Sequence, residues 1–372
     1  MMSLFRIGPL ILLAPIAVYF FFYFKRSLGF WKVPVKKLWI KLLIAAVCAL
    51  LMAASASIWS VNLIIIMHWF FLCVLVQLIC WILRLAFRRN EKARQKVRSI
   101  YASGLVPVGL TIIVILLGYW NMNRIVEKDY TIYTQKDIRE EGYQVVFISD
   151  MHFGISISLE ELSAYAAEIE AQKPDLVLLG GDIVDESTTK ENLQKVFSVL
   201  GGIQSTYGTY YVYGNHDRAR YSDRADFNAV DLQKAIQDAG VRILSDDVVV
   251  INDEFTLVGR EDASMKANRA QSAKLLAAAD QTDFILLLDH QPRDLEANQA
   301  AGVDLQLSGH THNGQIWPAG LISSAFQFNE MTYGYEKLGN FQVIVSSGIA
   351  GWGYPIRTSG NSEYLVLSIK PE

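Results

Sequence analysis

The stretch "YQVVFISDMHFG", residues 143–154, decides the fold of the larger part of the chain. Its apolar run has the length of a buried strand, and two polar residues, Asp150 and His152, follow at once. The same arrangement recurs in "DLVLLGGDIVD" (175–185), "GTYYVYGNHDR" (208–218), "DFILLLDHQP" (283–292) and "VDLQLSGHTHNG" (303–314). Because the carboxyl ends of parallel strands meet at one edge of a sheet, the pattern predicts a functional site at that edge.

Helical patterns separate these strands. The segment "LEELSAYAAEIEA" (159–171) predicts a helix with Ser158 as N-cap and Glu161 three residues later, as in a capping box. Two more helices are predicted from "TKENLQKVFSVLG" (189–201) and "FNAVDLQKAIQDAG" (227–240), the second closed by Gly240. Strands that alternate with helices predict an α/β architecture, and short β runs between 241 and 259 and after 340 predict a second sheet. This α/β domain is expected to occupy residues 142–372.

The first third of the chain has a different composition. Four apolar runs occur there, at Ile7–Phe24, Leu42–Ile58, Asn62–Leu83 and Gly104–Trp120. A helix needs about 20 residues to cross the hydrocarbon core of a bilayer, and these runs have or approach that length. We therefore predict an N-terminal four-helix transmembrane region over residues 1–128. The polar segment "DYTIYTQKDIREE" (129–141) is expected to be a linker or else a first edge strand.

Basic residues are distributed unevenly between the connections of this region. Six Lys/Arg lie between residues 25 and 41 and seven lie between 84 and 98, whereas the second connection, Ser60–Val61, has none. The positive-inside rule places the two basic connections in the cytoplasm, so the N-terminus and everything after Trp120 are expected outside. Residues 130–372 carry 34 Asp/Glu against 18 Lys/Arg, which argues against nucleic acid as a partner.

Five of the six histidines follow the predicted strands, and each lies beside a carboxylate, an amide or a glycine. Imidazole, carboxylate and amide oxygens without sulfur suit Mn²⁺, iron, Zn²⁺ or Co²⁺, of which we favour Mn²⁺. Two ions about 3.5–4 Å apart can clamp the attacking and leaving oxygens of a phosphoryl group. Seven ligand groups are too many for one ion and suit two: Asp150, His152, Asp182, Asn215, His290, His310 and His312.

These blocks resemble the signature of the calcineurin-like metallophosphoesterase superfamily, which is D-x-H, G-D, G-N-H-[D/E], H and G-H-x-H in this order. The resemblance covers residues 143–369 and is closest to the branch with "GHTH-x-GQ", here "GHTHNGQ" (309–315), and a late segment that is here "SSGIAGWGYPIR" (346–357). It implies a two-sheet β-sandwich flanked by helices and a metal-dependent phosphoric ester hydrolase, in a branch that is often membrane-attached or exported. Asn313 departs from the branch, where glycine is common.

The resemblance also implies roles for individual residues. One ion takes Asp150, His152, Asp182 and His312, and the other takes Asp182, Asn215, His290 and His310, so that Asp182 is the bridge. His216 resembles the family histidine that contacts the phosphate and protonates the leaving oxygen. A carboxylate is expected to orient this imidazole. Asp185, spaced as in the family's G-D-x-x-D, is the better candidate and Asp217 the second; the alternative for Asp185 is a loop carboxylate or a helix cap.

Two arginines near the predicted site, Arg218 and Arg357, are expected to bind a substrate phosphate, because the guanidinium fork matches phosphate oxygens. The alternative for each is a surface ion pair. Trp317 and Trp352 are candidates either for lining a substrate groove or for plain packing.

The expected function is hydrolysis of a phosphoester by a multi-pass membrane protein whose catalytic domain lies outside the cytoplasm. This location favours a lipid-linked or envelope phosphoester as substrate, with membrane lipid as the other partner. Two other classes stay open: a membrane sensor or scaffold whose phosphoesterase-like domain only binds a ligand, and a transporter. The presence of all seven ligands with His216 argues against a pure binding module. The near absence of charge within the apolar runs argues against a polar transport path.

Overall fold

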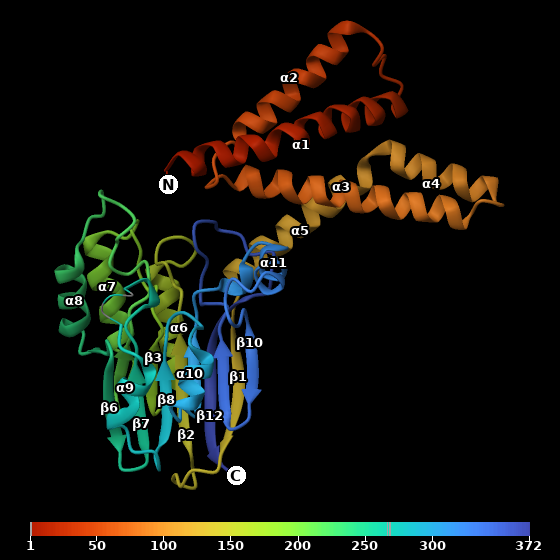
Figure 1. The fold of residues 1–372 in the computed structure, drawn as a ribbon. Helices are drawn as coiled ribbons and strands as arrows, with labels where there is room; N and C mark the ends of the chain where they lie inside the picture. Colours follow the sequence, from red (N-terminus) through yellow and green to blue (C-terminus); the bar gives the residue numbers. More distant parts are fainter. Residues whose placement is uncertain (1, 266, 268) are drawn as a thin grey trace. The chain divides into compact units, whose positions relative to one another are not determined.

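The structure of the chain, a computed structural model, describes residues 2–265, 267 and 269–372, and the side chains of these residues except 2–12 and 278 (Figure 1). The chain divides into two compact units after Gly118. The first unit is helical. The second consists of two sheets and the helices that cover them.

Long apolar helices make up the first unit. They are α1 (Met2–Phe30), α2 (Leu38–Ala54), α3 (Val61–Ala86), α4 (Glu91–Ser103) and α5 (Leu105–Asn123), the last of which ends in the second unit. Phe20 is fully buried in this unit, and its ring centroid lies 4.6 Å from that of Trp69. Apolar side chains also cover the outside, where Leu38 and Leu50 are each 70% exposed. So much exposed apolar surface is typical of a contact with lipid or with another protein.

Two of these helices, α3 and α5, are long and apolar enough to cross a membrane. They correspond to the third and fourth predicted spans. Helix α2 is apolar but has 17 residues, and it lies four residues earlier than the second predicted span. The first predicted span, Ile7–Phe24, falls partly on residues whose side chains lie outside the described ones. A region of four spans therefore stays a prediction.

The basic connection before the last predicted span contains a helix of its own. Residues Glu91–Ser103 form α4, and the side chain of the N-cap residue Asn90 accepts a hydrogen bond from the amide of Ala93. Gly104 ends the helix in the left-handed conformation, with a φ of 73°. The sequence contains both capping residues, but the charge pattern by itself indicates only a connection.

The second unit contains two six-stranded sheets. The first has the order β1 (Ile125–Thr134), β12 (Ser362–Pro371), β2 (Tyr143–Ile148), β3 (Leu176–Leu179), β4 (Thr209–Tyr211), β5 (Arg242–Ile243). The second has the order β10 (Gly334–Leu338), β11 (Phe341–Val345), β9 (Leu305–Ser308), β8 (Phe284–Leu288), β7 (Phe255–Gly259), β6 (Asp247–Asn252). Both sheets are mixed, since β12 runs antiparallel to β2 and β6 runs antiparallel to β7.

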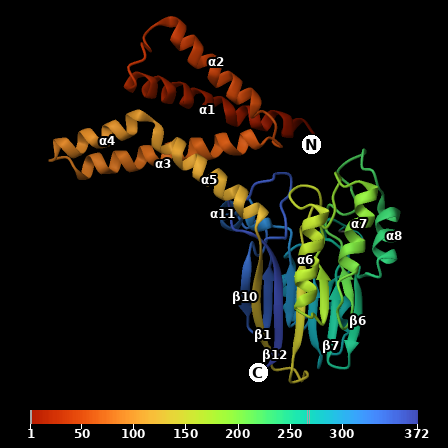
Figure 2. The same cartoon turned by 180° about the vertical axis from the view of Figure 1, so that it is seen from behind.

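Helices cover the outer faces of both sheets. On the first sheet lie α6 (Leu159–Ala171), α7 (Lys190–Gly201) and α8 (Ala229–Asp238), which Figure 2 shows from behind. On the second lie α9 (Ser272–Leu275) and α10 (Leu295–Ala300), and α11 (Ala319–Ala325) lies near the end of the sheets. Short 3₁₀ turns occupy Ala263–Met265, Leu276–Ala278 and His312–Gly314. The layers confirm the predicted two-sheet sandwich flanked by helices, and the capping box of Ser158 with Glu161 is confirmed as well.

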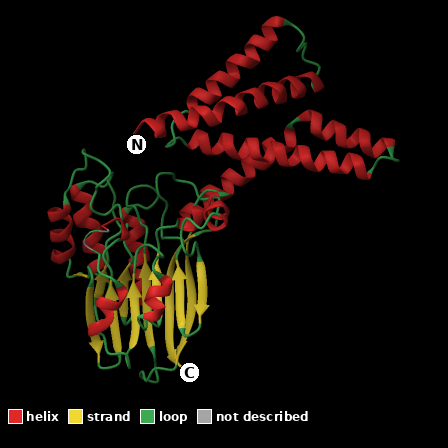
Figure 3. Ribbon diagram, viewed as in Figure 1, coloured by secondary structure: helices red, strands yellow, loops and turns green. Residues whose placement is uncertain are grey.

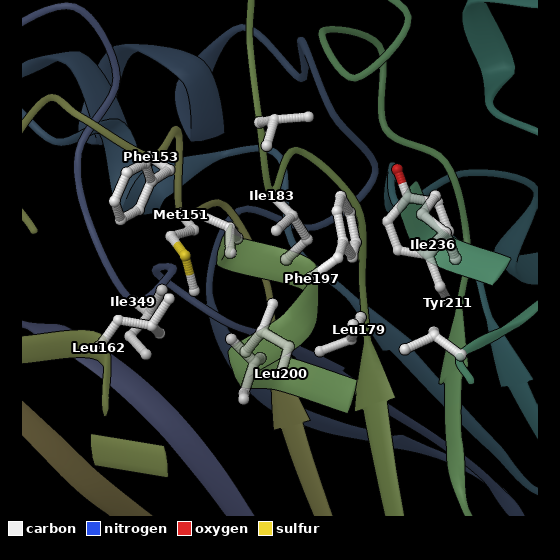
Figure 4. Close-up of a cluster of buried hydrophobic side chains, with 14 of the residues drawn as sticks. Met151, Phe153, Leu162, Leu179, Ile183, Phe197, Leu200, Tyr211, Ile236 and Ile349 are labelled. Atoms are coloured by element: carbon white, nitrogen blue, oxygen red, sulfur yellow. The ribbon is translucent and has the colours of Figure 1, made fainter. Parts of the chain in front are cut away.

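Two apolar layers fix the strands in place. Strand residues alternate between the layers, so Leu178 packs between the sheets whereas Leu179 packs under the helices. Figure 4 shows the helix side of the first sheet, where Leu179 lies near Phe197 and Leu200. Each fully buried side chain of this size contributes about 1.5–3 kcal/mol to folding. This packing stabilises the strands whose ends carry the predicted site.

The segment 129–141, which the sequence predicts as a linker or a first edge strand, begins inside β1. This strand pairs in parallel with β12 over its whole length, from Ile125 to Thr134. Near its end the side chains alternate, since Ile132 and Thr134 are buried and Tyr133 between them is 53% exposed. The alternation is that of a half-buried strand, so the linker interpretation is corrected for residues 129–134.

Candidate metal centre

The predicted edge is formed by parallel strands of both sheets. Strands β2, β3 and β4 are parallel neighbours in the first sheet, and β8 and β9 are parallel neighbours in the second. The loops that follow these five strands meet at one end of the sandwich, above the arrowheads in Figure 3. They carry all seven predicted ligands and His216.

The predicted ligands form two clusters. Asp150, His152 and His312 each offer an atom, and these atoms all lie within 4.8 Å of one another; the same holds for Asp182, His290 and His310. Asp182 lies between the clusters, because its Oδ2 is 3.6 Å from His152 Nε2 and 3.2 Å from His290 Nε2. The histidines of "GHTH" are thus divided between the clusters, one to each.

The backbone of these residues is strained. Positive φ angles occur at Asp150 (53°), His152 (39°), Asp182 (51°), His310 (69°) and His312 (50°). A non-glycine residue held in this region costs on the order of 1–3 kcal/mol, and such strain tends to concentrate at functional sites. The surrounding sheets therefore impose the loop conformation, which turns short side chains toward a common point.

Two glycines allow the loops to approach the carboxylates. A Cβ at Gly214 would lie 2.2 Å from Asp182 Oδ1, and a Cβ at Gly309 would lie 2.1 Å from Asp150 Oδ2. Both distances are far below van der Waals contact. The backbone amide that follows Gly309, that of His310, donates to Asp150 Oδ1 at 2.8 Å. Glycine is therefore needed where one loop packs directly on a ligand of the next.

The residues present fit bound metal ions. Five buried polar atoms of the predicted ligands have no hydrogen-bond partner among the described residues: His152 Nδ1 and Nε2, His290 Nε2, His312 Nδ1 and Asn215 Oδ1. A buried polar atom without a partner costs about 1–3 kcal/mol, so several in one place call for a ligand. Nitrogen and oxygen donors without sulfur suit a borderline or hard divalent ion.

Three of the predicted ligands, Asp182, His310 and His312, have pKa values that suit metal binding. Burial raises the pKa of Asp182, but the facing His290 and His152 outweigh it, and the pKa lies well below the ordinary value. Burial, with a contribution from His152, lowers the pKa of His312 well below its ordinary value. Burial and the charge of His290 lower the pKa of His310 to about 4. For two others the direction is opposite: burial raises the pKa of Asp150, and the facing Asp182 outweighs burial and raises the pKa of His290. Ionised carboxylates and neutral imidazoles are the forms that bind metals.

The two carboxylates expected near His216 have other partners. Asp185 Oδ2 lies 3.3 Å from His152 Nδ1, and its Oδ1 accepts hydrogen bonds from the amide and hydroxyl of Ser187. Asp217 is fully buried and accepts four backbone amides, those of Asp182, Ile183, Val184 and Gly214. Asp185 therefore faces the predicted ligand His152, and Asp217 holds the loop of Asp182 through its amides.

The carboxylate beside His216 is Glu186, which the sequence analysis did not single out. His216 Nδ1 lies 3.0 Å from Glu186 Oε2 and 3.2 Å from Oε1. Burial lowers the pKa of His216, but the hydrogen bond to Glu186 and the charge of Asp182 outweigh it, so the pKa is raised. The rings of Tyr221 and Trp352 lie 4.9 Å and 5.3 Å from the imidazole, so Trp352 lies at the site.

Both arginines contact other groups of the protein. The guanidinium of Arg218 forms two hydrogen bonds with Glu261, at 2.7 and 2.8 Å, and lies 3.7 Å over the ring of Tyr213. Arg357 is fully buried and donates to the carbonyls of His312, Ser347 and Ala350. It therefore fixes the loop that carries His312, and a contact of either arginine with a substrate phosphate stays a prediction.

Comparison with known proteins agrees with this geometry. The family described as calcineurin-like phosphoesterase matches residues 143–314. An uncharacterised metallophosphoesterase of Helicobacter pylori strain J99 is 30% identical over 274 residues, which are 69% of each chain. Phosphodiesterase YaeI of Escherichia coli is 29% identical over 61% of this chain and 82% of that protein. A transmembrane protein with metallophosphoesterase domain from Danio rerio is 26% identical over 62% of this chain and 53% of that protein. The chain belongs to the calcineurin-like phosphoesterases.

Proposed function

We propose that this chain is a membrane-anchored phosphoesterase that uses two divalent ions to hydrolyse a P–O bond. The observation that carries the proposal is the pair of ligand clusters on either side of Asp182, at the edge where five parallel strands end. Membership of the family supports a metal-dependent hydrolase. The relatives include a phosphodiesterase, which supports a phosphodiester among the substrates to be tried.

The first ion would be held by Asp150, His152, Asp182 and His312, and the second by Asp182, Asn215, His290 and His310. When bound, two such ions supply Lewis-acid stabilisation of charge on phosphoryl oxygens and acidify a water molecule. The carboxylate of Asp182 is shared, and the buried Asp217 holds its backbone through the amide at 2.7 Å. We favour Mn²⁺, on the donor set alone.

His216 is the proposed acid for the leaving oxygen. Its ring centroid lies 5.3 Å from that of His152, so the imidazole borders the first cluster without belonging to it. Its backbone amide donates to Asp182 Oδ1 at 2.8 Å, which anchors the main chain of the residue to the central carboxylate. A raised pKa keeps a larger fraction of the imidazole protonated near pH 7 than for a free histidine.

The proposed location is a membrane, with four spans and the metal centre outside the cytoplasm. Support comes from α3 and α5, from the transmembrane relative, and from the thirteen Lys/Arg of the two basic connections against none in Ser60–Val61. A domain held at the outer surface favours a lipid-linked or envelope phosphoester as substrate. This step rests on the proposed location.

Hydrolysis assays on the full chain in detergent test the activity. Aryl phosphomonoester and phosphodiester are supplied with Mn²⁺, Zn²⁺ or no metal, beside the variant His216→Ala. We expect metal-dependent turnover that falls at least about 100-fold in the variant, the scale of a general acid. Bound metal without turnover of either ester, or of lipid phosphoesters, would favour a ligand-binding sensor instead.

Labelling of intact cells tests the side of the membrane. The natural cysteines Cys48, Cys73 and Cys80 are buried, so a cysteine introduced at the exposed Lys190 offers a distinct target for a membrane-impermeant maleimide. We expect labelling without permeabilisation. Labelling that appears only after permeabilisation would place the metal centre in the cytoplasm and redirect the search to cytoplasmic phosphoesters.

A further inference from the structure

Two adjacent carboxylates after β3 turn to different histidines. Asp185 faces His152, at 3.3 Å, whereas Glu186 faces His216, at 3.0 Å. One oxygen of Asp185 lies 3.3 Å from His152 Nδ1, and the other accepts hydrogen bonds from the amide and hydroxyl of Ser187. The hydrogen bonds described for His216 Nδ1 go to Glu186 instead.

We propose that Glu186 is the positioning residue for His216, and that Asp185 serves the first metal cluster through His152. The inference rests on the proposed function, because it assigns the support of the proposed acid. The spacing G-D-x-x-D suggests that Asp185 orients His216. We infer instead that Asp185 holds His152 and that the adjacent Glu186 holds His216.

Glu186 holds one nitrogen of the imidazole and leaves the other for substrate. With Nδ1 donating to the carboxylate, the imidazolium carries its second proton on Nε2, and this is the proton that can be transferred; the neutral ring then keeps its proton on Nδ1. Glu186 is itself held, since the amide of Tyr221 donates to its Oε1 at 3.3 Å. The side chains of Glu186 and His216 are 17% and 14% exposed, so solvent screens their interaction only in part.

Three further contacts restrict the ring of His216. The amide of His216 is bonded to Asp182, and the rings of Tyr221 and Trp352 lie against the imidazole. The hydrogen bond between Nδ1 and Glu186 adds a fourth contact, so the backbone of His216, its ring and one ring nitrogen are all held. Loss of the carboxylate alone should leave the ring near its place but free to rotate, with the wrong nitrogen protonated part of the time.

The proton balance of the step is simple. As the bond between phosphorus and the leaving oxygen breaks, Nε2 gives its proton to that oxygen, which departs as an alcohol. The oxygen of water becomes bonded to phosphorus and the water gives up one proton to solvent, while a proton taken from solvent restores the imidazolium. The carboxyl group of Glu186 faces Nδ1 and stabilises the imidazolium before the transfer. Its contribution is therefore largest for an alcohol that leaves poorly, because such an oxygen needs the proton most.

Variants of the two carboxylates in the full chain in detergent test the division. For Glu186→Gln we expect two bound ions and a loss of turnover that is about 10–100-fold larger on an alkyl ester than on the matching 4-nitrophenyl ester. Glu186→Asp should restore part of the loss. For Asp185→Asn we expect weaker metal retention and an equal loss on both esters. Glu191→Gln, the same change on the exposed face of α7, is the matched control.

Tungstate, a phosphate mimic, gives a readout that does not need turnover. Its affinity for the metal-loaded chain should fall in Glu186→Gln and in His216→Ala, and the double variant should lose no more than His216→Ala. Independent losses that add in the double variant, or equal loss on both esters in Glu186→Gln, would overturn the inference. If the wild-type chain binds two ions but turns over neither ester, the proposed function fails, and the tungstate cycle still decides the role of Glu186.

Discussion

Phe20 of the helical unit and Phe197 of the sheet unit are both 0% exposed, yet the two regions around them follow opposite rules. Around Phe20, apolar side chains also cover the surface, as Leu50 at 70% exposure illustrates. Around Phe197 the apolar side chains are inside, and the buried carboxylates Asp150 and Asp182 lie at the sheet edge of the predicted site. The difference indicates that the two units are suited to different surroundings. Buried carboxylates need a partner, which at this edge would be a metal ion, whereas exposed apolar surface needs lipid or protein around it.

The largest expected effect comes from the buried charge. Asp182→Asn removes the shared carboxylate and should lower kcat/KM by about 1,000-fold, since several kcal/mol of charge stabilisation are lost at about 1.4 kcal/mol per tenfold. Steady-state assays with an aryl phosphodiester and saturating Mn²⁺ measure it. Retention of a tenth of the activity would show that Asp182 is not central to the site.

Replacing Phe20 or Phe197, which are equally buried, with alanine compares the loss of stability in the helical unit with that in the sheet unit. Phe197→Ala should destabilise the sheet unit by about 3–5 kcal/mol. Phe20→Ala should cost only about 2 kcal/mol in a bilayer, because lipid is as apolar as the protein interior and only packing is lost. Chemical denaturation in lipid nanodiscs, followed by the fluorescence of each unit, gives both values. Equal losses of unfolding free energy in the two variants would mean that water, and not lipid, surrounds the helical unit.

Gly309→Ala tests how closely the loops of the metal centre pack. The new Cβ would lie 2.1 Å from Asp150 Oδ2, so Asp150 or the loop of His310 must move. We expect metal affinity to fall about 10–100-fold, the scale seen when groups that orient ligands are disturbed. Calorimetric titration with Mn²⁺ measures it, and Gly109→Ala in α5, where a Cβ meets nothing within 4 Å, controls for the added methyl group. An unchanged affinity would show that this approach is not required.

The smallest effect is expected on the apolar surface. Phe22 is 60% exposed, and Phe22→Ala should change the stability of the helical unit by less than about 0.5 kcal/mol in lipid. The same nanodisc measurement applies. A loss near that of Phe20→Ala would indicate that this face is covered by protein.

The sequence predicts the strands and the clustering of the candidate ligands, because both depend on local pattern. The apolar run 143–149 and its polar end identify β2 and the first two ligands without knowledge of any neighbour. The parallel order of β2, β3 and β4 then brings Asp150, Asp182 and Asn215 to the same edge.

The contacts of Arg357, Asp185 and Glu186 could not be predicted from the sequence, because spacing along the chain does not encode them. Arg357 is buried against three carbonyls, one of them that of His312, forty-five residues earlier in the chain. Asp185 and Glu186 are adjacent, and only the turn after β3 decides which of them faces His152 and which faces His216. The one available signal for Glu186 is its position directly after a candidate orienting carboxylate. β1 was ambiguous because its partner, β12, lies at the other end of the chain.

Metal analysis of the purified wild-type chain tests the central claim most directly. The chain is loaded with Mn²⁺, freed of excess ion by gel filtration, and analysed by mass spectrometry beside His310→Ala and His312→Ala. The account predicts two ions per wild-type chain and loss of one ion in each variant, because the two histidines belong to different clusters. A wild-type chain that retains no ion with Mn²⁺, Zn²⁺, Fe²⁺ or Co²⁺ would contradict the account.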